Sequence, residues 1–209
     1  MKKKHLSLAV SVAVISLASM SVNAAFASTV NSVNVQFINQ GTSVPYHGEY
    51  AGYYNAKVNG IDTIVMCDDF TTPINYGQTW QANEFTYADV MGGASTKFSG
   101  VSKYNQAGWL FSQTAAVTPS VRAQMQGAIW NIMTPGSVVM DPLAQSYFNA
   151  ATNGTHNSYN WSNVMKVLTP TPAASGQEFL TAAPVPVPAS IWLLGSGLLG
   201  LVGVSRRPA

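Results

Sequence analysis

The chain carries one cysteine, Cys67, within the segment Val65–Phe70. A thiolate is a nucleophile and a metal ligand, but a single cysteine cannot form an internal disulfide. Three interpretations stay open: a reactive nucleophile, an intermolecular disulfide, or a small buried side chain that only packs. His47 and His156 could act as a base toward the thiol, although no cysteine-protease motif surrounds either of them.

A second segment of interest lies on a predicted helix and reads Gln126-Gly127-Ala128-Ile129-Trp130. Together with Met66-Cys67-Asp68-Asp69, it resembles the thioester domains of Gram-positive surface adhesins. In that family a hydrophobic-Cys-x-Asp strand motif faces a Thr-Gln-x-Ala-hydrophobic-Trp helix motif. The resemblance implies an internal thioester between Cys67 and Gln126. It also assigns three supporting positions: Asp69, Ala128 and Trp130.

The implied chemistry is the attack of a thiolate on a side-chain carboxamide, with ammonia as the leaving group. The product is a buried acyl group that waits for an amine on a partner. Met125 stands where the adhesin motif has Thr, so the hydroxyl beside Gln126 is absent. The charges of Asp68 and Asp69 oppose a thiolate, although strand alternation turns Asp68 away from Cys67. In the alternative interpretation, Cys67 is structural.

Other kinds of site have weaker support in the sequence. Asp68 and Asp69 are adjacent on a strand and point to opposite faces, and no calcium-binding loop is present. The chain has no nucleophile elbow, P-loop or dinucleotide fingerprint, so we expect no enzyme activity, no cofactor and no metal. A secreted hydrolase is an alternative without a supporting motif. Several aromatic residues could stack on sugar rings and bind a glycan without a covalent bond: Tyr46, Tyr50, Tyr53, Tyr54 and Trp80.

The N-terminal region, residues 1–27, has the pattern of a secretory signal peptide. Lys2, Lys3 and Lys4 precede the apolar run Leu6–Leu17, and Ala25-Phe26-Ala27 offers a cleavage site. Between this region and residue 183 there are five basic and eight acidic residues, which gives a net charge of −3. The basic character of the whole chain therefore belongs to its ends, and the charge does not indicate nucleic-acid binding.

The C-terminal region, residues 184–209, combines a proline segment, an apolar stretch and a basic end. Pro184, Pro186 and Pro188 favour an extended backbone, residues 189–204 carry no charge, and Arg206 and Arg207 follow. This order resembles the PEP-CTERM sorting signal, which exosortase-type transpeptidases recognise. Val187 stands where the usual motif has Glu. The resemblance implies export, a transient stage at the inner membrane, and a final place on the cell surface or in the extracellular matrix. A plain C-terminal membrane anchor is the alternative.

Local patterns predict the elements of the central region. Alternation predicts a strand over Val33–Phe37, and Asn59-Gly60 predicts a hairpin that leads into a strand over Ile61–Cys67. The remaining expected elements are a strand over Trp80–Tyr87, helices over 101–112, 119–133 and 142–150, and a closing strand over 164–168.

These elements indicate one α+β domain over residues 28–168, in which antiparallel N-terminal strands precede a helical block and a closing strand. Residues 169–183 are expected to form a linker, and 189–204 a short transmembrane helix. The predicted function is that of an exported, exosortase-sorted protein of the cell surface or an exopolysaccharide matrix. Its expected partners are the exosortase, transiently the membrane, and a surface polysaccharide or amine-bearing molecule.

Overall fold

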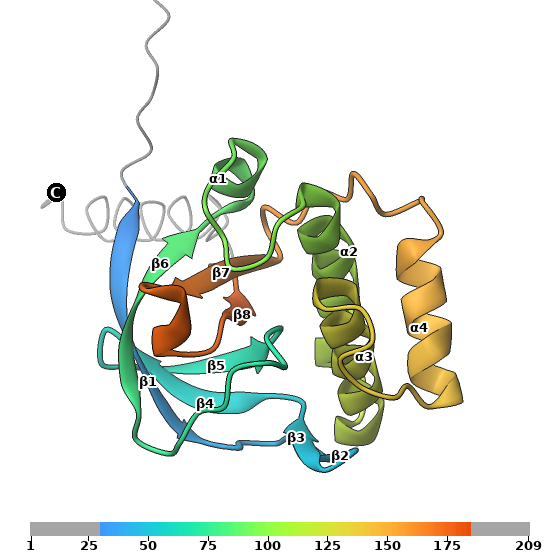
Figure 1. Cartoon of the computed structure of the whole chain (residues 1–209), viewed down its shortest axis with the longest axis horizontal. Helices are drawn as coiled ribbons and strands as arrows, with labels where there is room; N and C mark the ends of the chain where they lie inside the picture. The colour runs from blue at the N-terminus through green and yellow to red at the C-terminus, as the bar shows by residue number, and fades with distance from the viewer. Residues whose placement is uncertain (1–29, 185–209) are drawn as a thin grey trace, which may run out of the picture.

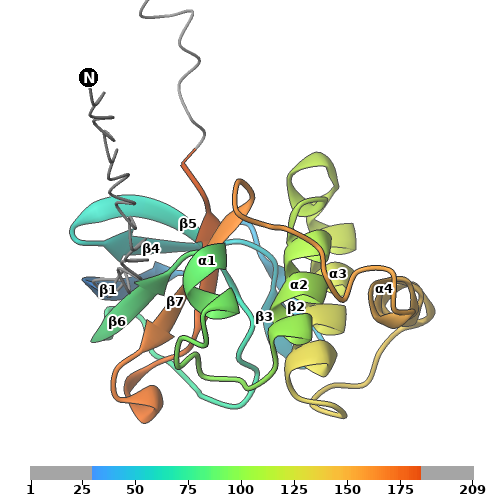
Figure 2. The ribbon, with the colours of Figure 1, turned by 90° about the horizontal axis from the view of Figure 1, so that it is seen from above.

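The structure is a computed structural model that describes residues 30–184. The predicted signal peptide and, apart from Pro184, the predicted sorting signal lie outside these residues. The described part has two layers, a β-barrel and a block of helices beside it (Figure 1). Figure 2 shows the same arrangement from above, with helix α4 (Pro142–Thr152) on the side of the block away from the barrel.

Six antiparallel strands close into the barrel in the order β1-β4-β5-β8-β7-β6. Their bounds are β1 Asn31–Asn39, β4 Tyr54–Val58, β5 Ile61–Cys67, β6 Thr79–Phe85, β7 Met165–Pro170 and β8 Phe179–Ala182. Two short strands, β2 (Val44–Tyr46) and β3 (Glu49–Ala51), form a separate hairpin between β1 and β4.

The barrel interior is filled by side chains that alternate along the strands. Val33, Val35 and Phe37 point inward and are buried, which confirms the strand predicted there. The predicted hairpin turn is also confirmed, because Asn59 and Gly60 adopt φ values of 50° and 81° between the paired residues Val58 and Ile61.

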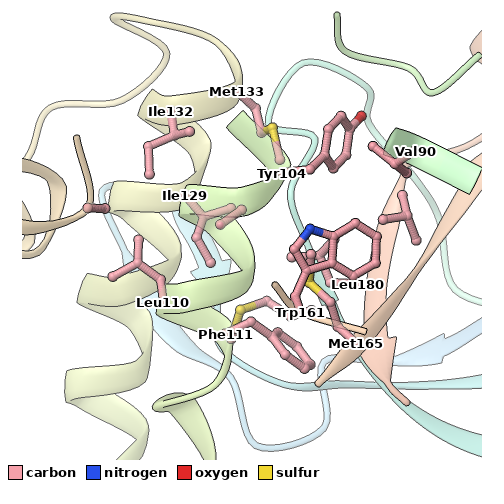
Figure 3. Packing of buried hydrophobic residues seen from close by; sticks show 14 of the residues in the cluster. Val90, Tyr104, Leu110, Phe111, Ile129, Ile132, Met133, Trp161, Met165 and Leu180 are labelled. Carbon is pink, nitrogen blue, oxygen red and sulfur yellow. The ribbon is translucent and has the colours of Figure 1, made fainter. Parts of the chain in front are cut away.

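The helices come from the segment between β6 and β7. Besides α4, they are α1 (Tyr87–Met91), α2 (Val101–Phe111) and α3 (Pro119–Met133), with a short 3-10 turn at Thr114–Ala116. A second 3-10 turn, Ala173–Ser175, lies between β7 and β8. The predicted start of α3 is confirmed, since the Thr118 side chain accepts a hydrogen bond from the Val121 N–H and Pro119 occupies the first turn. Figure 3 shows side chains from these helices and from the barrel meeting in one apolar cluster: Leu110, Phe111, Ile129, Ile132, Trp161, Met165 and Leu180 among them.

Helix α3 is the central element of the helical block. It is buried on most of its surface because the barrel, α2, α4 and the β2–β3 hairpin all pack on it. The hairpin approaches closely at Gly127, where an added Cβ would lie 2.6 Å from the Tyr46 ring. This packing places the middle of α3 against the end of β5.

The expected α+β arrangement is wrong. The strands do not form an open sheet with one closing strand. Instead, two strands, β7 and β8, complete a closed barrel, and β8 lies between β5 and β7. Closure removes sheet edges, whose unpaired backbone groups would otherwise be exposed. The strand pairings that close the barrel join residues far apart in the sequence, as the hydrogen bond from the Thr181 hydroxyl to the Ile64 carbonyl oxygen illustrates. Local sequence patterns therefore do not reveal them.

Two further expectations belong to the C-terminal part of the chain. The segment 169–183, expected as a linker, contains the end of β7 and all of β8. The expected transmembrane helix over 189–204 lies outside the described residues. Within residues 30–184, no helix combines the length and the apolar character that crossing a membrane requires.

Candidate functional site

Cys67 is the last residue of β5, at the barrel end that faces α3. Its thiol is 1% exposed and donates a hydrogen bond of 3.0 Å to the Asp69 carbonyl. Burial raises the pKa of the Cys67 thiol well above its usual value, and the charges of Asp68 and Asp69 act in the same direction. The thiol is therefore protonated in the folded protein at neutral pH.

Gln126 projects from α3 toward this strand end and is fully buried. Its Nε2 donates to the Cys67 carbonyl oxygen at 2.9 Å and to the Tyr54 hydroxyl at 3.3 Å. Its Oε1 accepts from the backbone N–H of Gly52. Three hydrogen bonds thus fix the plane of the carboxamide, and the structure brings the two predicted site residues together.

Gly52 supplies the N–H on the carbonyl side of this carboxamide. Its φ is 133°, and a Cβ at this position would lie 2.9 Å from the Ser43 Cα. Only glycine fits such a conformation without strain. The glycine therefore allows the β3–β4 connection to turn its N–H toward Gln126. The sequence analysis missed Gly52, because nothing in the local pattern links it to a helix 74 residues away.

The supporting positions have different surroundings. The Trp130 ring lies against Phe70, with centroids 5.1 Å apart. The Trp130 Nε1 has no hydrogen-bond partner within residues 30–184. Ala128 belongs to the apolar cluster between the helices and the barrel. Asp69 turns its carboxylate to Lys97 and Thr71 rather than to the thiol.

A pocket of about 480 Å³ opens beside the strand end, and Cys67 forms part of its wall. Aromatic rings make up much of the lining, and the remaining lining residues include a carboxylate and several amides. The residues most relevant to recognition are Glu49, Tyr50, Tyr54, Phe70, Tyr76, Asn75, Trp130 and Gln177. Burial raises the pKa of Tyr54, so its hydroxyl stays protonated; it donates to the Tyr50 carbonyl oxygen. A small polar molecule with an apolar face could enter here.

His47 and His156, the two histidines of the described residues, lie away from Cys67. His47 contacts the Asp141 carboxylate at 3.0 Å, and His156 stacks on Trp109 with ring centroids 3.9 Å apart. Neither lines the pocket beside Cys67. In the part of the chain that the structure describes, no group of His, Cys, Asp and Glu side chains is arranged to hold a metal ion.

A buried polar cluster next to the site was not predicted. Glu178 and Tyr104 are fully buried, and the Tyr104 hydroxyl donates to the Glu178 carboxylate at 2.6 Å. Asp68 lies beside them, also fully buried. Glu178 was missed because its segment has the composition of a linker. Lys97, whose backbone N–H donates to the Glu178 carboxylate, was missed because it belongs to a loop without periodicity.

Comparison with known protein families matches residues 184–207 to the PEP-CTERM protein-sorting motif. No curated protein and no solved structure matches the chain. The sorting motif predicted from the sequence is confirmed, and it supports an exported, exosortase-sorted protein of the cell surface. The resemblance to adhesin thioester domains has no support from these comparisons.

Proposed function

We propose that this exported surface protein attaches covalently to an amine through an internal thioester between Cys67 and Gln126. The observation that carries the proposal is the position of the Gln126 carboxamide, which is held against the Cys67 backbone by a 2.9 Å hydrogen bond. A buried glutamine next to a solitary buried cysteine is the pair of groups that the reaction needs.

Thioester formation is a condensation that requires no co-reactant. The Cys67 Sγ attacks the Gln126 Cδ, and negative charge develops on Oε1, where the Gly52 N–H stabilises it. The bond from Cδ to Nε2 then breaks. Nε2 leaves as ammonia and carries away the proton that the thiol has lost. The Tyr54 hydroxyl accepts from Nε2 and donates to the Tyr50 carbonyl oxygen, so it would turn its proton from that oxygen to the nitrogen to assist this departure.

Attachment follows when a primary amine reaches the acyl carbon through the pocket. The amine forms an amide with the Gln126 acyl group, and Cys67 is released as a free thiol. Glu49 lines the pocket and can attract an ammonium group toward it. Each molecule reacts once, so the protein acts as an attachment device rather than as an enzyme.

The partner in this proposal is an amine-bearing component of a surface or exopolysaccharide matrix. Sorting would bring the protein to that partner, with an exosortase-type transpeptidase acting on the C-terminal motif at the inner membrane. The mature protein would then reside on the cell surface or in the matrix.

Intact-mass measurement of the purified protein tests the thioester. We expect a mass lower by one ammonia, a thiol that resists alkylation, and a gain of one methylamine when that amine is added. The Cys67→Ala and Gln126→Ala variants should each have the mass calculated from their own sequence, with no ammonia missing. Neither variant should take up methylamine. Gln124→Ala removes another glutamine carboxamide from the same helix, two residues from Gln126, and is the matched control, which should behave as the wild type.

A non-covalent glycan-binding site is the second candidate function, and the aromatic and amide lining of the pocket favours it. In this case Cys67 is structural, the protein has its full mass, and unfolding exposes an alkylatable thiol. Tyr76→Ala should then weaken glycan binding, because it removes a 61% exposed residue at the pocket. Cys67→Ala should leave glycan binding unchanged.

A further inference from the structure

Lys97 and Asp69 form the most deeply buried ion pair of the described residues. The Lys97 Nζ contacts the Asp69 Oδ2, and the two side chains are 12% and 0% exposed. The pairs Lys166–Glu84 and Lys57–Asp62 are more accessible to water. Asp69 directly follows the end of β5, and Lys97 lies in the loop between α1 and α2, so the contact joins segments 28 residues apart.

The surroundings hold both groups in place. The Lys97 Nζ also donates to the Thr72 Oγ1 at 2.7 Å and to the Gly176 carbonyl oxygen at 3.1 Å. The Asp69 Oδ1 accepts from the Thr71 N–H at 3.0 Å and from the Thr71 hydroxyl at 2.8 Å. A primary amine therefore lies against a carboxyl group whose other oxygen has two hydrogen-bond donors.

Two more carboxyl groups are buried beside this pair. The Asp68 side chain is fully buried, and its carboxyl group interacts with the carboxyl group of Glu178. Burial, then the neighbouring charges of Glu178 and Asp69, raise the pKa of Asp68 well above its usual value. Burial raises the pKa of Glu178 as well. Glu178 accepts from the Lys97 backbone N–H at 2.9 Å, which brings this acidic pair to the lysine.

We infer that Lys97 and Asp69 become joined by an intramolecular amide bond between the lysine Nζ and the aspartate Cγ, with loss of one water. Proton transfer from the ammonium to the carboxylate gives a neutral amine and a carboxylic acid. The Nζ attacks Cγ, and the charge that develops on Oδ1 is stabilised by the two Thr71 donors. Oδ2 leaves as water with two protons that originate on the lysine.

The proton transfers in this step follow the direct contact between the Lys97 Nζ and the Asp69 Oδ2, so that Oδ2 can leave as water. The overall change, ammonium plus carboxylate to amide plus water, balances without an oxidant or a co-reactant. Burial favours this direction because it holds the reacting groups together and excludes the water that would reverse the reaction.

The crosslink would tie the loop after β5 to the loop before α2. Both flank the barrel end that carries Cys67, two residues from Asp69, so the bond would limit the separation of the barrel from the helices at the site. The inference does not depend on the thioester.

High-resolution intact mass and peptide mapping of the purified full-length mature protein test the crosslink. We expect a mass lower by one water, and a branched peptide in which Lys97 resists tryptic cleavage and is linked to Asp69. Lys97→Arg keeps the charge and should restore the missing water. Asp69→Ala removes the acyl partner and should restore the missing water as well. Lys166→Arg is the matched control and should leave the crosslink intact.

The thioester and the crosslink are distinguishable, because one removes ammonia and the other water. Cys67→Ala should still lack one water. If the denatured wild-type protein shows no loss of water and its Lys97 amine reacts fully with an acylating reagent, the inference is overturned. Folding of each variant is checked by circular dichroism, and Lys97→Arg and Asp69→Ala give two independent routes to the uncrosslinked state.

Discussion

At the scale of single residues, the unusual feature is the density of polar groups that the fold buries around Cys67. Gln126, Asp68, Asp69 and Glu178 are all fully buried. Burying a polar group is costly unless hydrogen bonds compensate, and Gln126 has three of them. Asp68 is buried beside Glu178, a second carboxyl group. Two neighbouring buried carboxyl groups lower the stability of the fold when both are ionised, which is consistent with a role beyond packing.

The raised pKa of Asp68 predicts how stability depends on pH. Its pKa is higher in the folded state than the value of about 3.9 expected in an unfolded chain. The folded protein therefore binds the proton on Asp68 more tightly than the unfolded chain does. The resulting stabilisation is fully present below the pKa of the unfolded state and is lost as the pH rises through the pKa of the folded state. Glu178, Asp69 and Tyr104 surround the group. We expect the free energy of unfolding to decrease from about pH 4 upward, measured by urea titration.

Asp68→Asn should weaken this dependence, since an amide does not titrate, whereas Glu178, whose pKa burial also raises, still contributes. Lys97→Arg retains Asp68 and serves as the control, so its stability should still decrease with pH. An Asp68→Asn variant whose pH dependence equals that of the wild type would show that another group is responsible.

At the scale of elements, the segments with the clearest sequence patterns adopt the predicted local structures. The site, in contrast, depends on connections between elements that no sequence pattern indicates. The Thr118-Pro119 start of α3 and the Asn59-Gly60 turn have local physical causes, a side-chain cap and a φ > 0 turn, and both are confirmed. The contact of Gln126 with the Gly52 N–H depends on how the β3–β4 connection meets α3, which no single element determines. The adhesin resemblance indicated Cys67, Gln126 and Asp69, but not Glu178 or its contact with the buried Asp68.

The packing of Trp130 on helix α3 predicts how its removal changes the free energy of unfolding. Trp130 is 2% exposed and packs against Phe70 and Tyr46. Trp130→Ala would leave a cavity between the helix and the pocket wall and should lower the free energy of unfolding by about 3–5 kcal/mol. Trp109→Ala, which removes a half-buried ring stacked on His156, is the control and should cost less. A loss below about 1 kcal/mol for Trp130→Ala would mean that the helix can close the cavity or lies less firmly on the barrel.

At the scale of the whole molecule, barrel closure was not predictable from the sequence. The chain enters the barrel with β1, leaves it after β6 and returns with β7 and β8, and helices fill the interval. The return strands Met165–Pro170 and Phe179–Ala182 pair with residues that are far away in the sequence. Pro170 and Pro172 made this region resemble a linker, although Pro170 ends a strand whose residues are largely buried. Long-range pairing, rather than local propensity, thus decides the architecture.

The C-terminal motif determines where this domain should act, and it can be tested on the intact chain. Residues 184–207 match the sorting motif directly after the barrel ends at Ala182. Because the described domain is complete before Pro184, deletion of 184–209 should leave it folded. The truncated protein should accumulate in the periplasm or the medium, whereas the intact protein should lose its tail and reach the surface. Fractionation with mass spectrometry of the mature C-terminus provides the measurement, and substitution of Arg206 and Arg207 by Ala provides a milder variant that retains the proline segment. A mature surface protein that still ends at Ala209 would contradict processing and favour a plain anchor.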